Sequence, residues 1–315
     1  MSRLGVLSNR YADGNRGGPP LSPRAGVTIA APDGIAEIPA ALARFAEAGV
    51  EVVAVDGGDG TLREVLSALP AAFGDRRPAI ALIASGKTNV AARDVGGFGT
   101  GDAAVARLAA HLDAGGGTAE RHCLEVLLPD RPPVRGFVVG AAMFAHATRM
   151  AGAWSHDRGI KQGAGVAMVI ARVLAQVLGG RIGPGVARLS IAADGAAPPP
   201  PTPHFLFLAS TLHRLSLGLR PFPQSGAGEL RWLGVDAPPT RLLRQLRRAW
   251  SGTVVREPGY AGGGAARLDL VLDGALVVDG ELYETETATV RLGEAIRFVA
   301  PNASHSAARQ DRLAR

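Results

Sequence analysis

Apolar and polar positions along residues 1–120 alternate between the spacing typical of strands and the spacing typical of helices. The runs LGVLSN (4–9), VEVVAV (50–55) and AIALIA (79–84) predict short buried strands. Apolar residues recur at helical intervals in IPAALARFAEAG (38–49), TLREVLSAL (61–69), VAARDVG (90–96) and 102–114. Strands that alternate with helices favour a parallel sheet with helices on both faces.

From about residue 121 the pattern becomes rich in strands. Short strand candidates follow one another: CLEVLL, RGFVVGAAM, ARLSIAAD, HFLFLAST, ELRWLGV, RLDLVLD and ALVVDGELYE. One predicted helical block, 161–178, interrupts them, and the proline-rich stretch 194–203 is expected to be a hairpin loop. The fold class we expect is α/β: a Rossmann-like parallel-sheet domain at 1–120, then a β-rich sandwich domain at 121–299. The segment 300–315 is expected to return to the first domain.

Composition narrows the function classes only a little. A hydrophobic fraction of 47% predicts a packed core, and the single cysteine fits a reducing compartment. The net charge of +6 suits nucleic acid, anionic lipid or a nucleotide equally. Nucleic-acid binding has little support, because no zinc-ligand spacing or RNP-like aromatic motif is present. No signal peptide is expected, because the N-terminal stretch MSRLGVLSNR has no apolar h-region. No transmembrane segment is expected either, since the apolar stretch 163–180 is short and interrupted by polar residues.

Basic residues cluster in RLLRQLRRAW (241–250). One interpretation is a solvated helix face, and the other is a basic, aromatic-flanked helix near a membrane surface. The sequence leaves both open, with a slight preference for the first.

The stretch VDGGDGTLREV (55–65) interrupts a good strand with glycines and aspartates. Glycine permits the positive φ of a tight turn, and a backbone without side chains also lets a phosphate come close. Thr61 and Glu64 match a capping box, which predicts a helix that starts there. No comparable structural reason accounts for Asp59. A strand, a glycine loop and a helix would place amides at the carboxyl edge of a parallel sheet, where open α/β sheets bind nucleotides.

A second turn, SGKTN (85–89), follows the strand at 79–84. A Walker A loop is excluded, because that motif requires glycine where Ala81 stands. We expect a second strand–loop–helix turn close to the first if the two strands are neighbours.

Together, GGDGTLREVLSAL and ASGKTNVAARDV resemble the catalytic domain of the diacylglycerol kinase and sphingosine kinase superfamily. The first block is similar to GGDGT-x-x-E-V, and the second aligns Gly86, Asn89, Ala92 and Arg93. Asn9 matches the end of the family's first strand, and VVDGELYE (277–284) resembles its D-G-E block. Four blocks in the expected order are more specific than GGDGT alone, which NAD kinases also carry.

The resemblance implies ATP as donor, Mg²⁺ held mainly by the ATP phosphates, and a hydroxyl of a diacylglycerol-like or sphingoid lipid as acceptor. The residues it assigns to nucleotide binding are Asn9, Gly57, Gly58, Asp59, Gly60, Thr61, Glu64, Gly86, Lys87, Thr88 and Asn89. The catalytic residues it implies are Glu281, Asp279 and Asp59. Of the two D-G-E carboxylates we favour Glu281 as general base, although Asp279–Gly280 also suits a hairpin turn, as does Asp273–Gly274.

Departures from the family pattern bear on activity. Lys87 replaces a threonine, Val90 an aspartate and Arg10 a proline. The counterpart of an aspartate-rich stretch that holds a structural magnesium in bacterial relatives is SGAGELRW (225–232), which lacks those aspartates. We therefore do not expect that metal. An NAD kinase and a non-catalytic nucleotide- or lipid-binding relative remain alternatives, although no Asn-Glu motif typical of NAD kinases appears in place. The lipid kinase would be cytoplasmic, peripheral on the inner membrane, and either monomeric or a homodimer.

Overall fold

The computed structural model describes residues 3–155, 171–172, 175, 179–180, 185–224 and 228–301. Two compact units divide the chain: Met1–Arg121 with Ala295–Arg315, and His122–Glu294. From the sequence we expected divisions after residues 120 and 299. The structure divides the chain after Arg121 and after Glu294, and the second of these divisions falls inside strand β15 (Thr287–Val299). Most of the helical block expected at 161–178, part of 225–232 and all of 302–315 lie outside the described residues.

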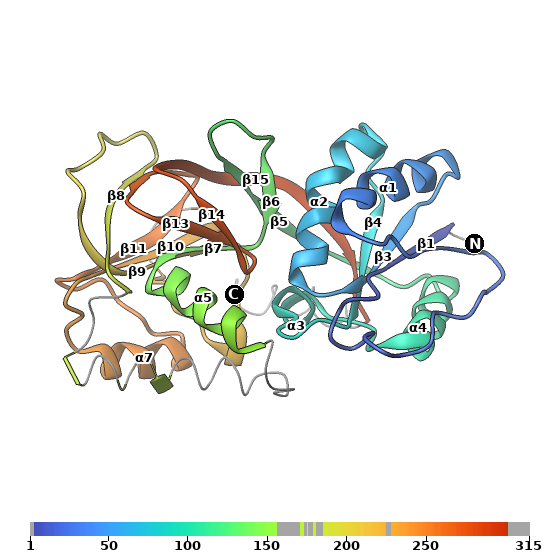
Figure 1. Ribbon diagram of the computed structural model, residues 1–315, viewed down its shortest axis with the longest axis horizontal. Helices are drawn as coiled ribbons and strands as arrows, with labels where there is room; N and C mark the ends of the chain where they lie inside the picture. Colours follow the sequence, from blue (N-terminus) through green and yellow to red (C-terminus); the bar gives the residue numbers. More distant parts are fainter. Residues whose placement is uncertain are drawn as a thin grey trace, which may run out of the picture. The chain divides into compact units, whose positions relative to one another are not determined.

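A parallel sheet forms the centre of the first unit (Figure 1). Its strand order is β2 (Val27–Ala30), β1 (Leu4–Ser8), β3 (Val52–Gly57), β4 (Ala79–Ala84) and the last residues of β15. The β1 and β3 strands are buried along their whole length, as their continuous apolar runs predict. The helices of this unit are η1 (Ile35–Glu37), α1 (Ile38–Glu47), α2 (Asp59–Phe73), α3 (Val90–Val95) and α4 (Gly101–Asp113).

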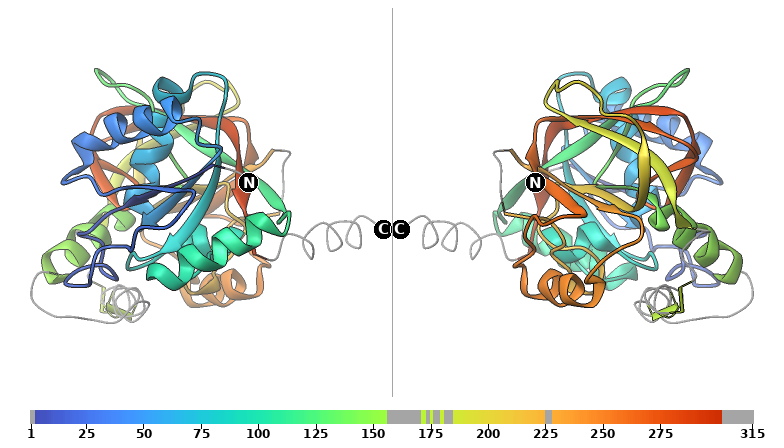
Figure 2. Two further views of the ribbon diagram at one scale, coloured as in Figure 1. Left: turned by 90° about the vertical axis from the view of Figure 1, so that its right-hand side faces the viewer. Right: turned by 90° about the vertical axis from the view of Figure 1, so that its left-hand side faces the viewer.

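Helices cover both faces of this sheet (Figures 1 and 2). Val105 and Leu108 of α4 pack on the face that carries Val6 and Ala54. The opposite face meets α1, because a Cβ on Gly5 would lie 2.9 Å from the ring of Phe45. The predicted doubly covered parallel sheet is therefore confirmed. The sequence missed β2, a four-residue edge strand that is only partly buried.

The second unit is rich in antiparallel strands. Its main path runs β14–β13–β7–β9–β8–β12–β15, while β10 pairs with β9 and β11, and β5 pairs with β15 and β6. The bounds are β5 (Thr118–Leu127), β6 (Val134–Gly136), β7 (Val138–Ala142), β8 (Ala187–Ala193), β9 (Thr202–Ser210), β10 (Leu230–Asp236), β11 (Tyr260–Ala265), β12 (Arg267–Leu272), β13 (Ala275–Val278) and β14 (Glu281–Glu284). The helical segments whose bounds lie within the described part of this unit include α5 (Met143–Ser155), η3 (Ser216–Gly218) and α7 (Leu242–Ser251).

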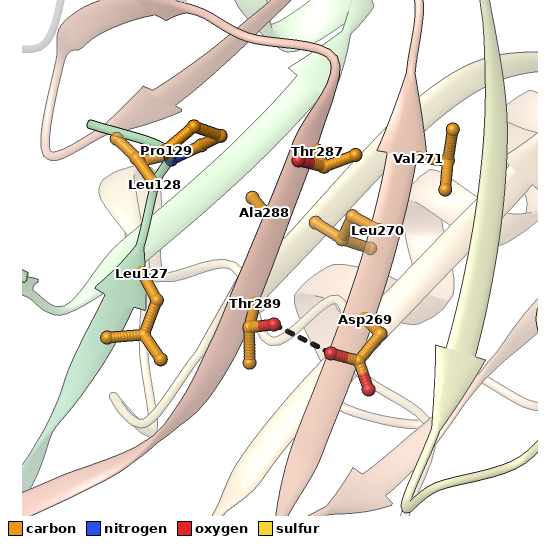
Figure 3. A pocket seen from close by; sticks show the side chains of 9 residues that line it. All are labelled: Leu127, Leu128, Pro129, Asp269, Leu270, Val271, Thr287, Ala288 and Thr289. Atoms are coloured by element: carbon orange, nitrogen blue, oxygen red, sulfur yellow. Dashed lines mark hydrogen bonds between the residues drawn. The ribbon is translucent and has the colours of Figure 1, made fainter. Parts of the chain in front are cut away.

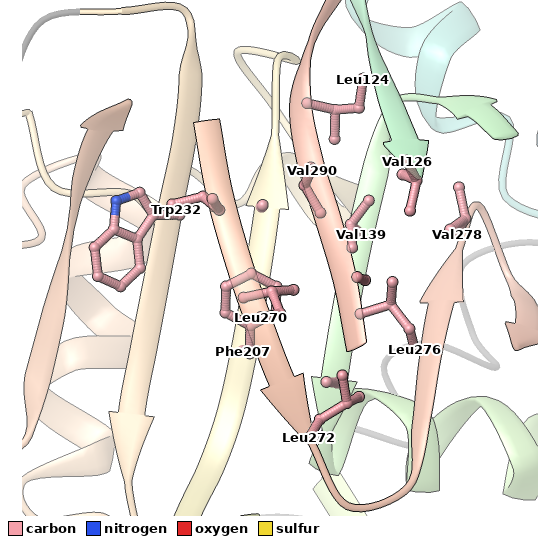
Figure 4. Packing of buried hydrophobic residues seen from close by; sticks show 14 of the residues in the cluster. Leu124, Val126, Val139, Phe207, Trp232, Leu270, Leu272, Leu276, Val278 and Val290 are labelled. Atoms are coloured by element: carbon pink, nitrogen blue, oxygen red, sulfur yellow. The ribbon is translucent and has the colours of Figure 1, made fainter. Parts of the chain in front are cut away.

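Side chains from many of these strands meet in one apolar core (Figure 4). Leu124, Phe207, Leu276 and Val290 are fully buried there, although they come from four different strands. The sequence missed β11 because its YAGGGA stretch has little apolar pattern. Gly262 allows that strand to approach β10, since a Cβ there would lie 2.4 Å from the carbonyl oxygen of Trp232.

The two Asp-Gly pairs differ. Asp279 and Gly280 have φ values of +44° and +88° and join β13 to β14, which pair as Val278 with Glu281. This is the two-residue turn with positive φ at both positions that suits a hairpin. The hairpin expected at Asp273–Gly274 is wrong, because β12 and β13 pair with other strands and not with each other. The hairpin loop expected at 194–203 is confirmed by the antiparallel pairing of β8 with β9.

None of the helices in the described part of the chain combines the length and apolar character needed to cross a bilayer.

The last strand supplies a test of how the first unit is built. Phe298 is fully buried and lies opposite Ile80 of β4, although more than two hundred residues separate them in the chain. We expect Phe298→Ala to lower the free energy of unfolding by about 3–5 kcal/mol, through lost burial and the cavity left behind. Val271→Ala is the control, because Val271 is 38% exposed on β12. Equal urea midpoints for the two variants would contradict a core role for β15.

Candidate functional site

Three loops meet where neighbouring parallel strands end. In the loop after β1, Gly14 N donates a hydrogen bond to Ser85 O at 2.8 Å, which joins this loop to the loop after β4. Ser85 N donates in turn to Gly57 O at 3.2 Å. Asn9 N donates to Asp56 O at 2.8 Å, so all three loops are tied together by backbone hydrogen bonds. The predicted proximity of the two glycine-containing turns is thus present in the structure.

A buried carboxylate lies beneath these loops. Asp56 is 1% exposed and accepts hydrogen bonds from Ser8 Oγ at 2.6 Å and Ser85 Oγ at 2.5 Å. It therefore links the ends of three strands, and its polar oxygens are satisfied as burial requires. Sequence reasoning missed this role. The available signal was an acidic residue directly after a continuous apolar run, followed by glycine.

The backbones of the two turns touch at Gly58 and Gly86. A Cβ on Gly86 would lie 2.2 Å from Gly58 Cα, and a Cβ on Gly58 would lie 2.9 Å from Gly86 Cα. No side chain fits at either position. Gly57 is similarly confined, since a Cβ there would lie 2.6 Å from Thr61 Oγ1. Gly60 is different, because a Cβ there would meet nothing within 4 Å.

Asp59 has a structural role that the sequence did not reveal. Its carboxylate accepts hydrogen bonds from Thr88 Oγ1 at 2.7 Å, Val90 N at 3.0 Å and Ala91 N at 3.2 Å. It thus supplies acceptors to the first amides of α3, where a negative charge is favourable. The expectation that Asp59 lacks a structural explanation is wrong.

The capping box expected at Thr61 and Glu64 is also wrong. The α2 helix begins at Asp59, its N-cap is Gly58, and no side chain caps it. Thr61 Oγ1 instead accepts from Asn9 Nδ2 at 2.9 Å, and Glu64 Oε1 accepts from Arg63 Nη2 at 2.5 Å. Because glycine at the N-cap offers no side-chain acceptor, the first amides of α2 are left to solvent or to a ligand.

The second turn is shaped by Asn89. Its backbone is left-handed, with φ of +49°, and its Oδ1 accepts from Gly86 N at 3.0 Å. Its Nδ2 donates to the carbonyl oxygens of Ala84 at 3.0 Å and Gly86 at 2.6 Å. Asn89 therefore folds the turn against itself, while the side chain of Lys87 is exposed.

Most of the residues that the sequence assigned to nucleotide binding lie in the loops after β1, β3 and β4 or at the start of α2, all in the first unit. Glu64 lies in the second turn of α2, paired with Arg63. Asp279 and Glu281 belong to the second unit. The Asp279 carboxylate accepts from Phe137 N at 3.0 Å and Val138 N at 2.9 Å, which fixes the turn. Glu281 begins β14 and is exposed.

The second unit also carries an open hollow of about 370 Å³ on its sheet surface, between β5, β12 and β15 (Figure 3). Asp269 is the ionisable residue of its described lining. Hydrogen bonds from Arg267 and Thr289 hold the pKa of Asp269 below its ordinary value. This carboxylate is therefore a poor proton acceptor near neutral pH, and the hollow offers little for catalysis. Among the residues the structure describes, no cluster of three His, Cys, Asp or Glu residues could hold a metal ion.

Comparison with known proteins agrees with the sequence resemblance. Residues 22–115 match the diacylglycerol kinase catalytic domain family. A diacylglycerol kinase structure from Bacillus anthracis str. Sterne aligns with a TM-score of 0.63 and 14% identity, over 96% of this chain and 98% of that one. Another structure from the same organism aligns with a TM-score of 0.69 at the same identity and coverage. No curated protein sequence matches the chain. The resemblance to the diacylglycerol kinase and sphingosine kinase superfamily is confirmed, and at this identity the structural neighbours show the fold alone.

The contact between the two turns can be tested directly. Gly86→Ala should lower the melting temperature clearly, because the added methyl group would overlap the Gly58 backbone and the side chain of Asn89. Gly60→Ala is the matched control, since its methyl group would meet open space. Alanine also favours a helix over glycine by up to about 1 kcal/mol, so this control should be neutral or stabilising. If the two variants melt alike, the turns do not touch as described.

Proposed function

We propose that this protein, whose residues 22–115 match the diacylglycerol kinase catalytic domain family, is an ATP-dependent lipid kinase. It would transfer the γ-phosphoryl group to a hydroxyl of a diacylglycerol-like or sphingoid lipid. The observation that carries the proposal is the meeting of two glycine turns at the carboxyl edge of a parallel sheet, beside a helix whose first turn has no side-chain cap. The family match supports a kinase-type phosphotransferase.

The first unit provides what phosphate groups require. The first amides of α2 point out of the helix start, and the helix dipole adds positive charge there. Gly60 lies in that first turn and leaves open space where a side chain would stand. Lys87 is exposed on the adjoining turn, so its ammonium group could reach the phosphates as a point charge.

Phosphoryl transfer depends mainly on positioning and on neutralising charge. Bound ATP would supply the phosphoryl group, with Mg²⁺ held mainly by the phosphate oxygens. In this proposal Asp59 and Asn9 are positioning residues: Asp59 holds the second turn against α2, and Asn9 holds the first loop against Thr61. Their effect on turnover would come through the shape of the phosphate site.

In this proposal Glu281 accepts the proton of the lipid hydroxyl. A carboxylate within reach of a hydroxyl can take its proton as attack proceeds. Asp279 is the weaker candidate, because two backbone amides already engage its carboxylate. Glu281 is exposed at the start of β14, where an acceptor could approach it.

The function can be tested with radiolabelled ATP and a total lipid extract. We expect label in a chloroform-soluble product, and mild alkaline hydrolysis then separates the two acceptor classes. A phosphorylated glycerolipid loses its ester-linked chains, whereas a phosphorylated sphingoid base survives. Label found only in NADP after addition of NAD would support an NAD kinase instead. Absence of any labelled product, with ATP binding retained, would indicate a non-catalytic relative.

The role of Glu281 has its own test. Glu281→Gln should lower lipid phosphorylation by about 100-fold or more, the scale of a lost general base, and leave ATP affinity nearly unchanged. Glu284→Gln is the matched control, because Glu284 is an exposed glutamate on the same strand, paired with Arg149. Label transfer and calorimetry measure the two quantities. Equal turnover in both variants would exclude Glu281 and direct the search to Asp279.

A further inference from the structure

Exposed apolar side chains gather in one short part of the second unit. Among the residues that the structure describes, six large hydrophobic side chains are exposed, and three of them lie between 243 and 255. Leu243 is 51% exposed, Trp250 46% and Val255 45%. Leu243 and Trp250 belong to α7, which lies at the surface of the second unit and is orange in Figures 1 and 2.

The inner side of α7 is fixed to the unit. Gln245 and Ala249 are buried, and Leu242 packs against a core cluster that includes Phe205 and Tyr260. Further hydrogen bonds hold both ends of the helix: Tyr260 donates its hydroxyl to Thr240 O at 2.5 Å, and Arg220 N donates to Ala249 O at 2.7 Å. Substitutions on the outer side therefore leave this anchorage intact.

The outer side combines apolar and basic residues. Leu243, Arg247 and Trp250 follow one another at intervals of four and three residues, so they share one helix face. Arg244 and Arg248 lie beside them, and a hollow of about 480 Å³ is lined by Leu243, Arg244, Arg247, Arg248 and Ser251. Leucine and tryptophan do not make an exposed helix more soluble. This face therefore fits a partner that can contact apolar and basic side chains together.

The positive charge of this face is only partly compensated. Arg241, Arg244 and Arg248 surround Glu257, with Arg241 at 3.5 Å and Arg248 at 3.8 Å. Four arginines including Arg247 and one glutamate leave three net positive charges. Burial acts to raise the pKa of Glu257, but hydrogen bonds from Gln245 and Arg244 and the charges of the arginines hold it below its ordinary value. Glu257 therefore stays ionised at neutral pH and keeps the arginines in place.

We propose that the outer face of α7 docks the protein on an anionic lipid bilayer. The headgroup region offers phosphates to Arg244 and Arg247, and the adjoining acyl boundary accepts Leu243 and Trp250. Tryptophan is favoured at such an interface because its ring is apolar and its N–H is polar. A nucleic acid would satisfy the arginines and leave the leucine in water, so the apolar residues favour the membrane. This inference rests on the proposed function, since it brings the enzyme to the surface where its lipid acceptor resides.

The test uses the full chain and two kinds of vesicle. One is phosphatidylcholine alone, and the other is phosphatidylcholine with phosphatidylglycerol. We expect co-sedimentation with the anionic vesicles only, weakened by salt, together with a blue shift of tryptophan emission. Trp250→Phe should retain most of the binding and lose most of the blue shift. Equal binding to both vesicles, or binding to neither, would overturn the proposal.

Charge reversal at one arginine gives the sharper comparison. Arg247→Glu should weaken binding to anionic vesicles by roughly tenfold, because a basic residue near an anionic surface attracts and a glutamate repels. Arg76→Glu is the matched control, an exposed arginine in the loop after α2 in the first unit. Leu243→Gln should also weaken binding while its salt dependence remains. If Arg247→Glu binds like Arg76→Glu, the face does not dock on lipid.

Activity separates this inference from the proposed function. With a short-chain diacylglycerol presented in solution, Arg247→Glu should phosphorylate at the wild-type rate; with anionic vesicles it should be slower. Vesicle binding by a wild-type protein that phosphorylates no lipid would refute the proposed function and leave the docking face standing. Kinase activity that Arg247→Glu lowers equally in both assays would refute the docking face alone.

Discussion

The contact between the backbones of Gly58 and Gly86 is the constraint on which the candidate site depends. With Cβ positions only 2.2 and 2.9 Å from the facing Cα atoms, neither residue can carry a side chain. The contact lies where the paired strands β3 and β4 end, and the buried carboxylate of Asp56 joins this place to the end of β1 through hydrogen bonds from Ser85 and Ser8. The first unit therefore presents backbone, with few side chains, at the carboxyl edge of its sheet. Backbone amides at a helix start are the groups that bind phosphate without a dedicated side chain.

The residues around this contact hold the fold together and also shape the proposed phosphate site. Asp59 starts α2 and supplies acceptors to α3, so one carboxylate fixes two helices relative to each other. Thr61 is turned inward to Asn9, and the N-cap of α2 is Gly58, so no side chain caps this helix. Gly60 is the exception in the loop, since packing does not demand glycine there. In the proposed function, this open position leaves room for the phosphates.

Much of the fold could be predicted from local pattern, and much of the site could not. The continuous apolar run at β4 and the helical spacing in α1 were sufficient to predict these two elements, because burial imposes such patterns on the sequence. The capping box failed because Thr61 lies inside the first turn: the helix starts at Asp59, and its N-cap is Gly58, three residues before Thr61. The partners of Asp59 lie 29 to 32 residues away, so only the tertiary fold reveals its role. The sequence did not predict strand β11 for a related reason: its glycines allow close approach to the backbone of Trp232 and produce no hydrophobic pattern.

The proposed function depends on binding of the ATP phosphates by the amides at the start of α2. Titration of isotopically labelled protein with ATP, followed by amide NMR, tests it at the residues concerned. We expect large, saturable shifts of the amides of Gly58, Asp59 and Gly60, reproduced in part by inorganic triphosphate without the nucleoside. Saturable ATP binding that moves other amides and leaves these three unshifted would contradict it.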